Sequence, residues 1–481
     1  MTAPLRIPFP VVDEVSRHCV QEEEPETVLI EVHLPGELDA GRLRKAFLEA
    51  LRRHPRVLMR ECPGPWYRRR YEWELTDEPD VEAVGFPPPG PGSLRDARSR
   101  AMAVAPPLTA SPPIRLEVVT APGDTESGAG GGAGGGADGR AGIVTGTALL
   151  LTLNHTALDG PAGLRILATT AEIYGGRDNS AAAPPVRPWG GPPARPPPPP
   201  TPAAGAAPGA PRAPPPPAPP GRPAGTPGAD APDTHSPWAS PAGVARGAPD
   251  PLPGPRRGNG LLHTELPLPH RPKGSPYTVN DQLMVATALT LAHWNREHGA
   301  RVRPLRITMP VDDRPRDATM PIGNGTRLVE VPFSPEELDT SDLPALLHRT
   351  ALRTRVLKVL PRPQLGHGAV LLTAPWGPVT ARGALTRALR RAAAPWMSTT
   401  LLSNIGRIPY PLDFGEGAGC AHAVWFSAPA RMPRGLTFAT ASTAGRLHLA
   451  VRWSRALLGH DDGAHLRDLF AHHLHSTEAT P

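Results

Sequence analysis

An imidazole and a carboxylate stand four residues apart in the stretch LTLNHTALDGPAG, residues 151–163. The apolar and Thr-rich residues 143–153 predict a buried strand that ends just before them. Asp159-Gly160 can then cap a helix, and Pro161 suits its first turn. The imidazole of His155 is therefore expected at the end of a rigid strand, where a base is well positioned, although a lone histidine beside a turn can also be purely structural.

The composition indicates that part of the 481 residues forms no core, because 68 are Pro and 49 are Gly. Residues 177–258 are dominated by Pro, Ala, Gly and Arg without any period, which predicts an extended, largely disordered linker. A second insert, the Gly-Ala run 128–136, joins two predicted antiparallel strands, 114–119 and 143–153. It is not a phosphate-binding loop, because no Lys-Ser/Thr follows it.

These inserts divide the chain into an N-terminal lobe (1–176), the linker (177–258) and a C-terminal lobe (259–481). The hydrophobic pattern of the C-terminal lobe predicts strands at 261–266, 305–311, 397–403, 422–427 and 447–453, and helices at 280–298 and 343–360. We therefore expect an α/β protein with two lobes of mixed open sheets. A ligand site is expected between the lobes, where such sites commonly form.

The net charge is +6, but the arginines are scattered and are balanced by 45 acidic residues. Without a zinc spacing or an aromatic-and-basic RNA motif, we expect no nucleic-acid partner. A mildly basic surface suits an acidic carrier protein or a phosphate-bearing thioester. We also expect no metal site, because His472-His473-x-His475 lies on a terminal helix and is predicted to be solvated.

The three cysteines, Cys19, Cys62 and Cys420, are far apart and form no disulfide framework, which suits a reducing cytoplasm. None of them has a recognisable nucleophile motif. The N-terminus lacks an apolar signal core, and no apolar run reaches the roughly 18–20 residues that cross a bilayer. We expect a cytoplasmic monomer that is at most peripheral to a membrane.

The segment His155-Thr-Ala-Leu-Asp159-Gly160 matches the pattern H-x-x-x-D-G. It resembles the acyltransferase superfamily of chloramphenicol acetyltransferase, peptide-synthetase condensation domains, polyketide-associated acyltransferases and wax ester synthases. Other segments resemble the same superfamily in the same order: Arg53-His54-Pro55 after an N-terminal helix, Thr278-Val-Asn280-Asp281, Met309-Pro310-Val311-Asp-Asp313-Arg314-Pro315 with Gly323-Asn324-Gly325, and Leu402-Ser403-Asn404-Ile405-Gly406. The resemblance covers nearly the whole chain apart from the two inserts.

This resemblance implies two chloramphenicol acetyltransferase-like lobes in a V arrangement, with a channel along their interface. It implies a condensation-like acyltransferase of specialised metabolism, such as nonribosomal peptide or polyketide assembly. An acyl or aminoacyl group would pass from a pantetheine thioester to an alcohol or amine acceptor. The donor would be coenzyme A or an acyl- or peptidyl-carrier protein, with no bound cofactor. No Ser or Cys stands at a catalytic elbow, so we expect direct transfer without an acyl-enzyme.

The motif His155, Asp159, Gly160 is assigned as the catalytic set. A neutral imidazole, with an ordinary pKa near ~6.5, suits a general base. The resemblance implies that Asp159 forms a structural ion pair with an arginine of the second lobe, which we match to Arg314, and Gly160 permits close backbone approach.

The developing oxyanion needs a hydrogen-bond donor. Ser403 and Asn404 are candidates, although they equally fit a turn that ends a strand.

Two alternatives stay open. Asn154 stands where condensation domains and wax ester synthases usually carry a first histidine, so the chain could be a catalytically inactive, condensation-like protein that binds a carrier or partner. A wax ester or diacylglycerol-type acyltransferase is favoured by Asn280-Asp281 but disfavoured by the single motif histidine.

Overall fold

The computed structural model describes residues 4–21, 23–121, 146–182, 240–248, 250, 258–315, 319–338, 340–360, 364–365 and 367–478. The predicted Gly-Ala insert (128–136) and most of the predicted linker (177–258) lie outside these residues, so both stay predictions. The limits proposed for the three regions of the chain also stay predictions.

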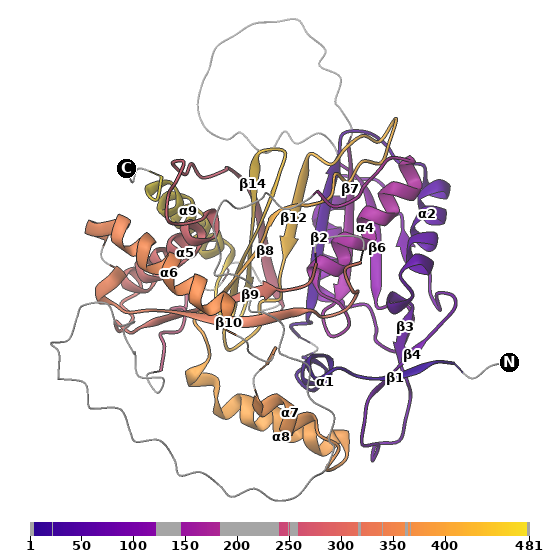
Figure 1. Cartoon of the computed structure of the whole chain (residues 1–481), viewed down its shortest axis with the longest axis horizontal. Coiled ribbons are helices and arrows are strands. Elements are labelled where there is room, and N and C mark those ends of the chain that lie inside the picture. Colours follow the sequence, from indigo (N-terminus) through magenta and orange to yellow (C-terminus); the bar gives the residue numbers. More distant parts are fainter. Residues whose placement is uncertain are drawn as a thin grey trace, which may run out of the picture. The chain divides into compact units, whose positions relative to one another are not determined.

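Five strands form the first sheet, in the order β12-β2-β7-β6-β5 (Figure 1). They are β2 (Thr27–Leu34), β5 (Val84–Gly85), β6 (Ile114–Ala121), β7 (Gly146–Asn154) and β12 (Ala423–Ser427). Side chains alternate along β2: Val28 and Ile30 join the main core, which includes α2 (Ala40–Arg53) and α4 (Gly160–Gly175). Leu29 packs instead with Ala97 of α3 (Ser93–Ala103). Both faces of the sheet are therefore covered, as the period of two along a strand requires.

The predicted pairing of residues 114–119 with 143–153 is confirmed, because β6 and β7 are antiparallel neighbours with Leu116 opposite Leu151. After β7 the chain turns into α4. Asp159 caps this helix by accepting a hydrogen bond from the N–H of Ala162 at 3.1 Å, and Gly176 ends it in the left-handed conformation, with φ of 65°.

A small sheet, β1-β4-β3, consists of β1 (Arg6–Pro8), β3 (Met59–Glu61) and β4 (Glu72–Leu75). The helix α1 (Val11–His18) follows β1, and a short 3₁₀ turn, η1 (Pro55–Val57), links α2 to β3. Phe9, between β1 and α1, stacks on Trp73 of β4 with ring centroids 4.0 Å apart. This contact anchors the start of α1 against the small sheet.

Six strands form the second sheet, in the order β10-β9-β11-β13-β14-β8. They are β8 (Asn259–Pro267), β9 (Leu305–Asp312), β10 (Thr326–Phe333), β11 (Thr400–Arg407), β13 (Leu436–Thr443) and β14 (Arg446–Ser454). A second core joins this sheet to α5 (Val279–Glu297), α6 (Leu343–Val359) and α9 (His460–Ser476). Thr278 and Asp281 form a capping box that starts α5.

One strand was assigned to the wrong lobe. Residues 422–427 were expected to close the C-terminal lobe, but β12 pairs with β2 of the first sheet, in antiparallel register with Val424 opposite Val32. A short apolar run carries no information about which sheet edge it will join. The predicted strand 397–403 also begins later than expected, at Thr400, because the 3₁₀ turn η4 (Ala394–Trp396) precedes it.

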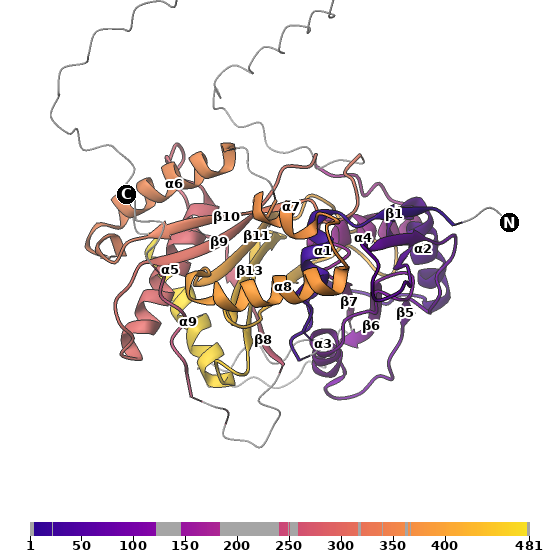
Figure 2. The same cartoon turned by 90° about the horizontal axis from the view of Figure 1, so that it is seen from below.

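Two further helices, α7 (His367–Thr373) and α8 (Val379–Ala392), contact α1 (Figure 2). With two mixed sheets, each covered by helices, the expected α/β fold is confirmed. None of the described helices combines the length and the apolar character that a membrane crossing needs.

Candidate active site

His155 follows β7 directly, in the turn that leads to α4. Its backbone N–H donates to the carbonyl oxygen of Glu26 at 2.8 Å, and its ring Nδ1 lies 3.1 Å from the carbonyl oxygen of Leu158. Because a carbonyl can only accept a hydrogen bond, Nδ1 carries the proton in the neutral ring and Nε2 keeps the lone pair. The partly exposed ring is thus held in the tautomer that a general base needs.

Asn154 uses both ends of its buried side-chain amide to hold the same turn. Its Nδ2 donates to the carbonyl oxygen of Pro106 at 2.8 Å, and its Oδ1 accepts from the N–H of Thr156 at 3.1 Å. Asn154, which stands where a two-histidine motif has its first histidine, is therefore a structural residue that helps to hold the turn of His155.

Asp159 connects this turn to the loop that follows β9. Its Oδ1 caps α4, while its Oδ2 accepts from Arg314 Nη2 at 2.7 Å and from the N–H of Gly325 at 2.8 Å. The side chains of Asp159 and Arg314 are only 3% and 9% exposed, so solvent screens this ion pair little.

Arg314 is held by several groups besides Asp159. Its Nε lies 2.9 Å from Asp312 Oδ1, and its Nη1 donates to the carbonyl oxygens of Pro321 and Gly323 at 3.2 and 3.0 Å. Burial acts to lower the pKa of Arg314, but the hydrogen bonds and charges of Asp312 and Asp159 outweigh it and raise that pKa. The guanidinium is therefore a permanent cation in a fixed orientation.

Two glycines allow these groups to approach. A Cβ at Gly160 would lie 2.2 Å from the ring of Phe426 on β12, and a Cβ at Gly325 would lie 2.3 Å from Arg314 Nε. Gly160 is thus required by the packing of α4 against β12, and Gly325 by the ion pair.

Asn324, which precedes Gly325, holds the His155 turn from the second lobe. Its Nδ2 lies 3.1 Å from the carbonyl oxygen of His155, 3.0 Å from that of Thr156 and 3.0 Å from Asp13 Oδ1. From sequence, Asn324 was noted only as part of the segment Gly323-Asn324-Gly325, without a role. Its position in that segment was the available signal.

Asp13 of α1 was missed altogether, and no motif marks it. Its carboxylate is 2% exposed and accepts hydrogen bonds from Asn324 and from Trp73 Nε1, the latter at 2.9 Å. Burial raises the pKa of Asp13 to about 6, although these hydrogen bonds and the charges of Arg56 and His155 act to lower it. A second ionisable group therefore lies within electrostatic range of His155.

Ser403 and Asn404 point to opposite faces of β11. Leu401, which shares a face with Ser403, and Ala439, which lies beside Ser403 on β13, belong to the core of the first lobe. Asn404 instead accepts from Thr440 Oγ1 at 3.1 Å and donates to Asn280 Oδ1 of α5 at 3.1 Å. The structure thus turns Ser403 toward the first lobe, whereas the amide of Asn404 is engaged within the second.

Of the three histidines near the C-terminus, His472 and His475 are exposed as predicted, but His473 is not. His473 is 7% exposed, so the prediction of a solvated side chain is wrong at this position. Its Nε2 lies 3.2 Å from His293 Nδ1, and burial lowers the pKa of His473 to about 4. In the described part of the chain, no three His, Cys, Asp or Glu side chains are grouped as a metal site requires.

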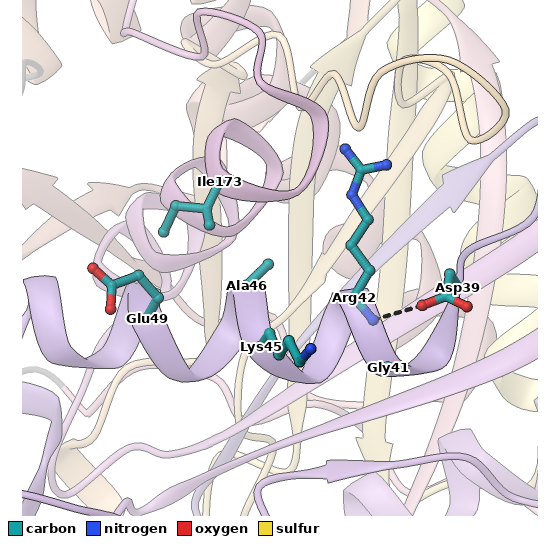
Figure 3. Close-up of a pocket in the computed structure, with 7 residues that line it drawn as sticks. All are labelled: Asp39, Gly41, Arg42, Lys45, Ala46, Glu49 and Ile173. Carbon is teal, nitrogen blue, oxygen red and sulfur yellow. Dashed lines mark hydrogen bonds between the residues drawn. The ribbon is translucent and has the colours of Figure 1, made fainter.

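A surface pocket of about 510 Å³ lies elsewhere, along α2 and the end of α4 (Figure 3). It is lined by Asp39, Gly41, Arg42, Lys45, Ala46, Glu49 and Ile173. None of the residues predicted for the site contributes to it, and we assign it no role in the chemistry of His155.

No protein-family model matches the chain. Two uncharacterized proteins, from two strains of Mycobacterium tuberculosis, are each 28% identical over 412 residues, which cover 84% of this chain and 84% of theirs. Their names assign no activity.

Several solved structures share the fold at low sequence identity. The condensation domain of the monacolin K polyketide synthase MokA aligns with a TM-score of 0.59 and 12% identity, over 100% of this chain and 99% of that one. The trichothecene 15-O-acetyltransferase TRI3 of Fusarium sporotrichioides aligns with a TM-score of 0.56 and 10% identity, over 98% and 95%. The first condensation domain of the CDA synthetase aligns with 0.56 and 13%, over 99% and 97%. The chain therefore has the fold of the condensation-domain-like and chloramphenicol acetyltransferase-like superfamily.

Proposed function

We propose that the protein is an acyltransferase that moves an acyl or aminoacyl group from a pantetheine thioester to an alcohol or amine. The observation that carries the proposal is the orientation of His155. Its Nδ1–H is anchored on the Leu158 carbonyl oxygen at 3.1 Å, and Nε2 keeps its lone pair at the end of a rigid strand. The likeness in fold to condensation domains and to an acetyltransferase supports the same reaction class.

In the proposed reaction, Nε2 of His155 takes the proton from the acceptor hydroxyl or amine as that group attacks the thioester carbonyl carbon. A tetrahedral intermediate forms, and its oxygen carries the negative charge. The C–S bond then breaks, the carbonyl re-forms, and the sulfur leaves with the proton held by the imidazolium. The products are an ester or amide and a free thiol.

Asp159 and Arg314 act as positioning residues in this proposal. Their ion pair connects the His155 turn to the loop after β9, and Asn324 holds the carbonyl oxygen of His155 from the same loop. A misplacement of about 1 Å by such supporting groups can reduce the rate 10²-fold, even without contact with the substrate.

Ser403 is the proposed donor to the oxyanion, because it faces the first lobe, whereas the amide of Asn404 is engaged with Asn280 and Thr440. The donor substrate would be a thioester of coenzyme A or of a carrier protein. The proposed reaction uses no bound cofactor.

Direct transfer can be tested by two measurements on the same samples. The protein is incubated with acyl-coenzyme A thioesters, with and without alcohol or amine acceptors. Thiol release should require the acceptor, and without it the intact mass of the protein should be unchanged. A stable acyl adduct on Cys19, Cys62, Cys420 or Ser403 would overturn the direct mechanism.

A second candidate, a non-catalytic protein that binds a carrier or partner, is favoured by Asn154, which is a structural residue here. This candidate predicts binding of an acylated carrier protein without thiol release for any acceptor. Acceptor-dependent thiol release that is lost in His155→Ala would exclude it.

A further inference from the structure

The exposed tryptophans of the described chain all lie in one region. Trp66, Trp376 and Trp396 are 73%, 57% and 49% exposed, whereas the other described tryptophans are buried. Tyr67, beside Trp66, is 60% exposed. Leaving large aromatic side chains in water is costly, and such clusters commonly mark an interaction surface.

Hydrogen bonds show that these segments, distant in sequence, form one surface. The N–H of Val379 donates to the carbonyl oxygen of Arg68 at 2.8 Å, and Thr380 Oγ1 donates to that of Trp66 at 3.1 Å. Trp376 Nε1 donates to the carbonyl oxygen of Leu371 at 3.0 Å. The loop before β4 therefore adjoins the start of α8, and Trp376 lies against α7.

The helix α8 adds an apolar stripe to this surface. Its exposed apolar residues recur at helical spacing: Ala381, Ala384, Leu385, Ala388, Leu389 and Ala392. Its buried residues, which include Arg382 and Thr386, face the other way, toward α1. We define the α7–α8 surface as Trp66, Tyr67, Val370, Leu371, Trp376, Leu385, Leu389 and Trp396; its helices face the viewer in Figure 2.

Only cations flank this stripe along the chain. No Asp or Glu occurs between Asp342 and Asp413, whereas Arg387, Arg390 and Arg391 lie on α8. Two acids of the first lobe that contact this region are held in ion pairs: Glu14 lies 2.9 Å from Arg382 Nη2, and Glu61 pairs with Arg17 and Arg68. The α7–α8 surface is therefore both apolar and basic.

We propose that the α7–α8 surface binds the surface of an anionic lipid bilayer. Trp and Tyr favour the headgroup level of a membrane, where an apolar ring and a polar edge are both accommodated. Leu371, Leu385 and Leu389 enter the acyl boundary, and the exposed Arg387 and Arg391 of α8 contact lipid phosphates. The positive charge along this segment matches an anionic leaflet, which attracts basic residues near its surface.

This surface adjoins the candidate site through α1. Arg382 of α8 pairs with Glu14, and Thr386 Oγ1 lies 3.4 Å from His18 Nδ1. The helix α1 also carries Asp13, whose carboxylate accepts a hydrogen bond from Asn324. The same Asn324 amide donates to the carbonyl oxygen of His155. Binding at the bilayer would therefore bring the site close to substrates dissolved in the lipid.

The first test is co-sedimentation of the full chain with phosphatidylcholine vesicles, with or without phosphatidylglycerol. We expect binding to the anionic vesicles, weaker binding at high salt, and little binding to phosphatidylcholine alone. Absence of binding to the anionic vesicles would overturn the proposal.

Variants separate the two contributions. Trp66→Ser/Leu371→Ser/Leu389→Ser removes apolar anchors, and Arg387→Glu/Arg391→Glu reverses the two exposed charges beside the stripe. Each variant should lower the partition coefficient at least about tenfold. The matched controls are Val81→Ser/Val104→Ser/Leu268→Ser, which are exposed elsewhere, and Arg52→Glu/Arg95→Glu on α2 and α3. Equal losses in the controls, or full binding by the apolar variant, would refute the assigned surface.

Tryptophan quenching by brominated lipids tests insertion directly. Trp66→Phe/Trp376→Phe/Trp396→Phe keeps apolar rings, so it should still bind vesicles but lose the quenching seen in the wild-type chain. Persistent quenching would show that other tryptophans enter the lipid. Binding of an acidic carrier protein through the same residues, without vesicle binding, would identify the occupant as a protein and overturn the lipid assignment.

Discussion

The two lobes contain the same strand–turn–helix junction, but only one of them carries reactive side chains. In the first, β7 ends at Asn154, whose carbonyl oxygen accepts from the N–H groups of the third and fourth following residues at 2.9 and 3.1 Å. In the second, β14 ends at Ser454, whose carbonyl oxygen accepts the equivalent bonds at 2.9 and 3.1 Å. The helices α4 and α9 begin at equivalent positions after these turns.

The two junctions differ at the positions that carry the candidate chemistry. His155 corresponds to Arg455, which is exposed, and Asp159 corresponds to Gly459, which has no side chain to cap its helix or pair with a cation. The backbone is thus a structural unit that either lobe can use. The candidate chemistry depends on His155 and on the loop that delivers Arg314 to Asp159.

The largest expected difference between the junctions concerns activity. His155→Ala should fold normally and lose roughly 10²- to 10⁴-fold in acyl transfer, since a general base contributes that much. Arg455→Ala, on the same backbone, should keep wild-type turnover. Steady-state thiol release measures both. Equal losses in the two variants would mean that the turn matters for folding alone.

The next difference concerns stability. Arg314→Ala leaves the buried carboxylate of Asp159 without its cation, so it should lower the free energy of unfolding by about 3–5 kcal/mol. Asp159→Ala should cost less, because Arg314 keeps its ion pair with Asp312. The double variant should cost less than the sum of the two. Asp462→Ala, which removes the carboxylate that accepts the N–H of Gly459 at 2.7 Å, should cost only about 1 kcal/mol. Urea unfolding gives all four values; strict additivity would contradict the pairing.

The two lobes should also respond oppositely to pH. Burial raises the pKa of Asp13 to about 6, so this carboxyl group stays protonated to a higher pH in the folded state than in the unfolded state. Asp13 should therefore reduce stability as the pH rises from about 4 to about 6, by roughly 2–3 kcal/mol. In the second lobe, burial lowers the pKa of His473 to about 4, so stability should be lost as the pH falls from about 6.5 to about 4.

Urea unfolding across this pH range checks both signs. Asp13→Asn should remove the loss on the rising side, and His473→Gln should remove the loss on the falling side. A slope in either window that its variant leaves unchanged would assign that slope to other groups.

The smallest difference concerns packing at the first residue of each helix. Gly160→Ala drives a methyl group into Phe426 and should destabilise the protein by about 1–3 kcal/mol, whereas His460→Ala, at an exposed position, should change stability by less than about 0.5 kcal/mol. Phe426→Leu should recover part of the loss when combined with Gly160→Ala. Thermal melting suffices for this comparison.

Local patterns were sufficient to predict some of these elements. The helix α5 begins and ends within one residue of its prediction, because Thr278 and Asp281 cap it and its apolar residues recur at helical spacing. The turn at His155 was likewise predicted from residues that are close in sequence. The assignment of Arg314 as the ion-pair partner of Asp159 came from the family resemblance and not from spacing.

Long-range contacts could not be predicted in this way. Asp13 and Asn324 become part of the site only when α1 and the loop after β9 meet the turn of His155. The apolar stripe of α8 also gives no sign in sequence that it stays exposed. By contrast, β10 was not predicted, although buried and more exposed residues alternate along Thr326–Phe333, which is the pattern of a strand.

The pairing of β12 with β2 determines when the first lobe can be completed during synthesis. The ribosome makes β2 (Thr27–Leu34) early and β12 (Ala423–Ser427) late. At about 5–20 residues per second, this edge of the sheet waits tens of seconds for its last strand. An unpaired edge of this kind is a template for association with other chains. We therefore expect rapid production of the protein to favour aggregation unless β2 is shielded until Ala423–Ser427 leaves the ribosome.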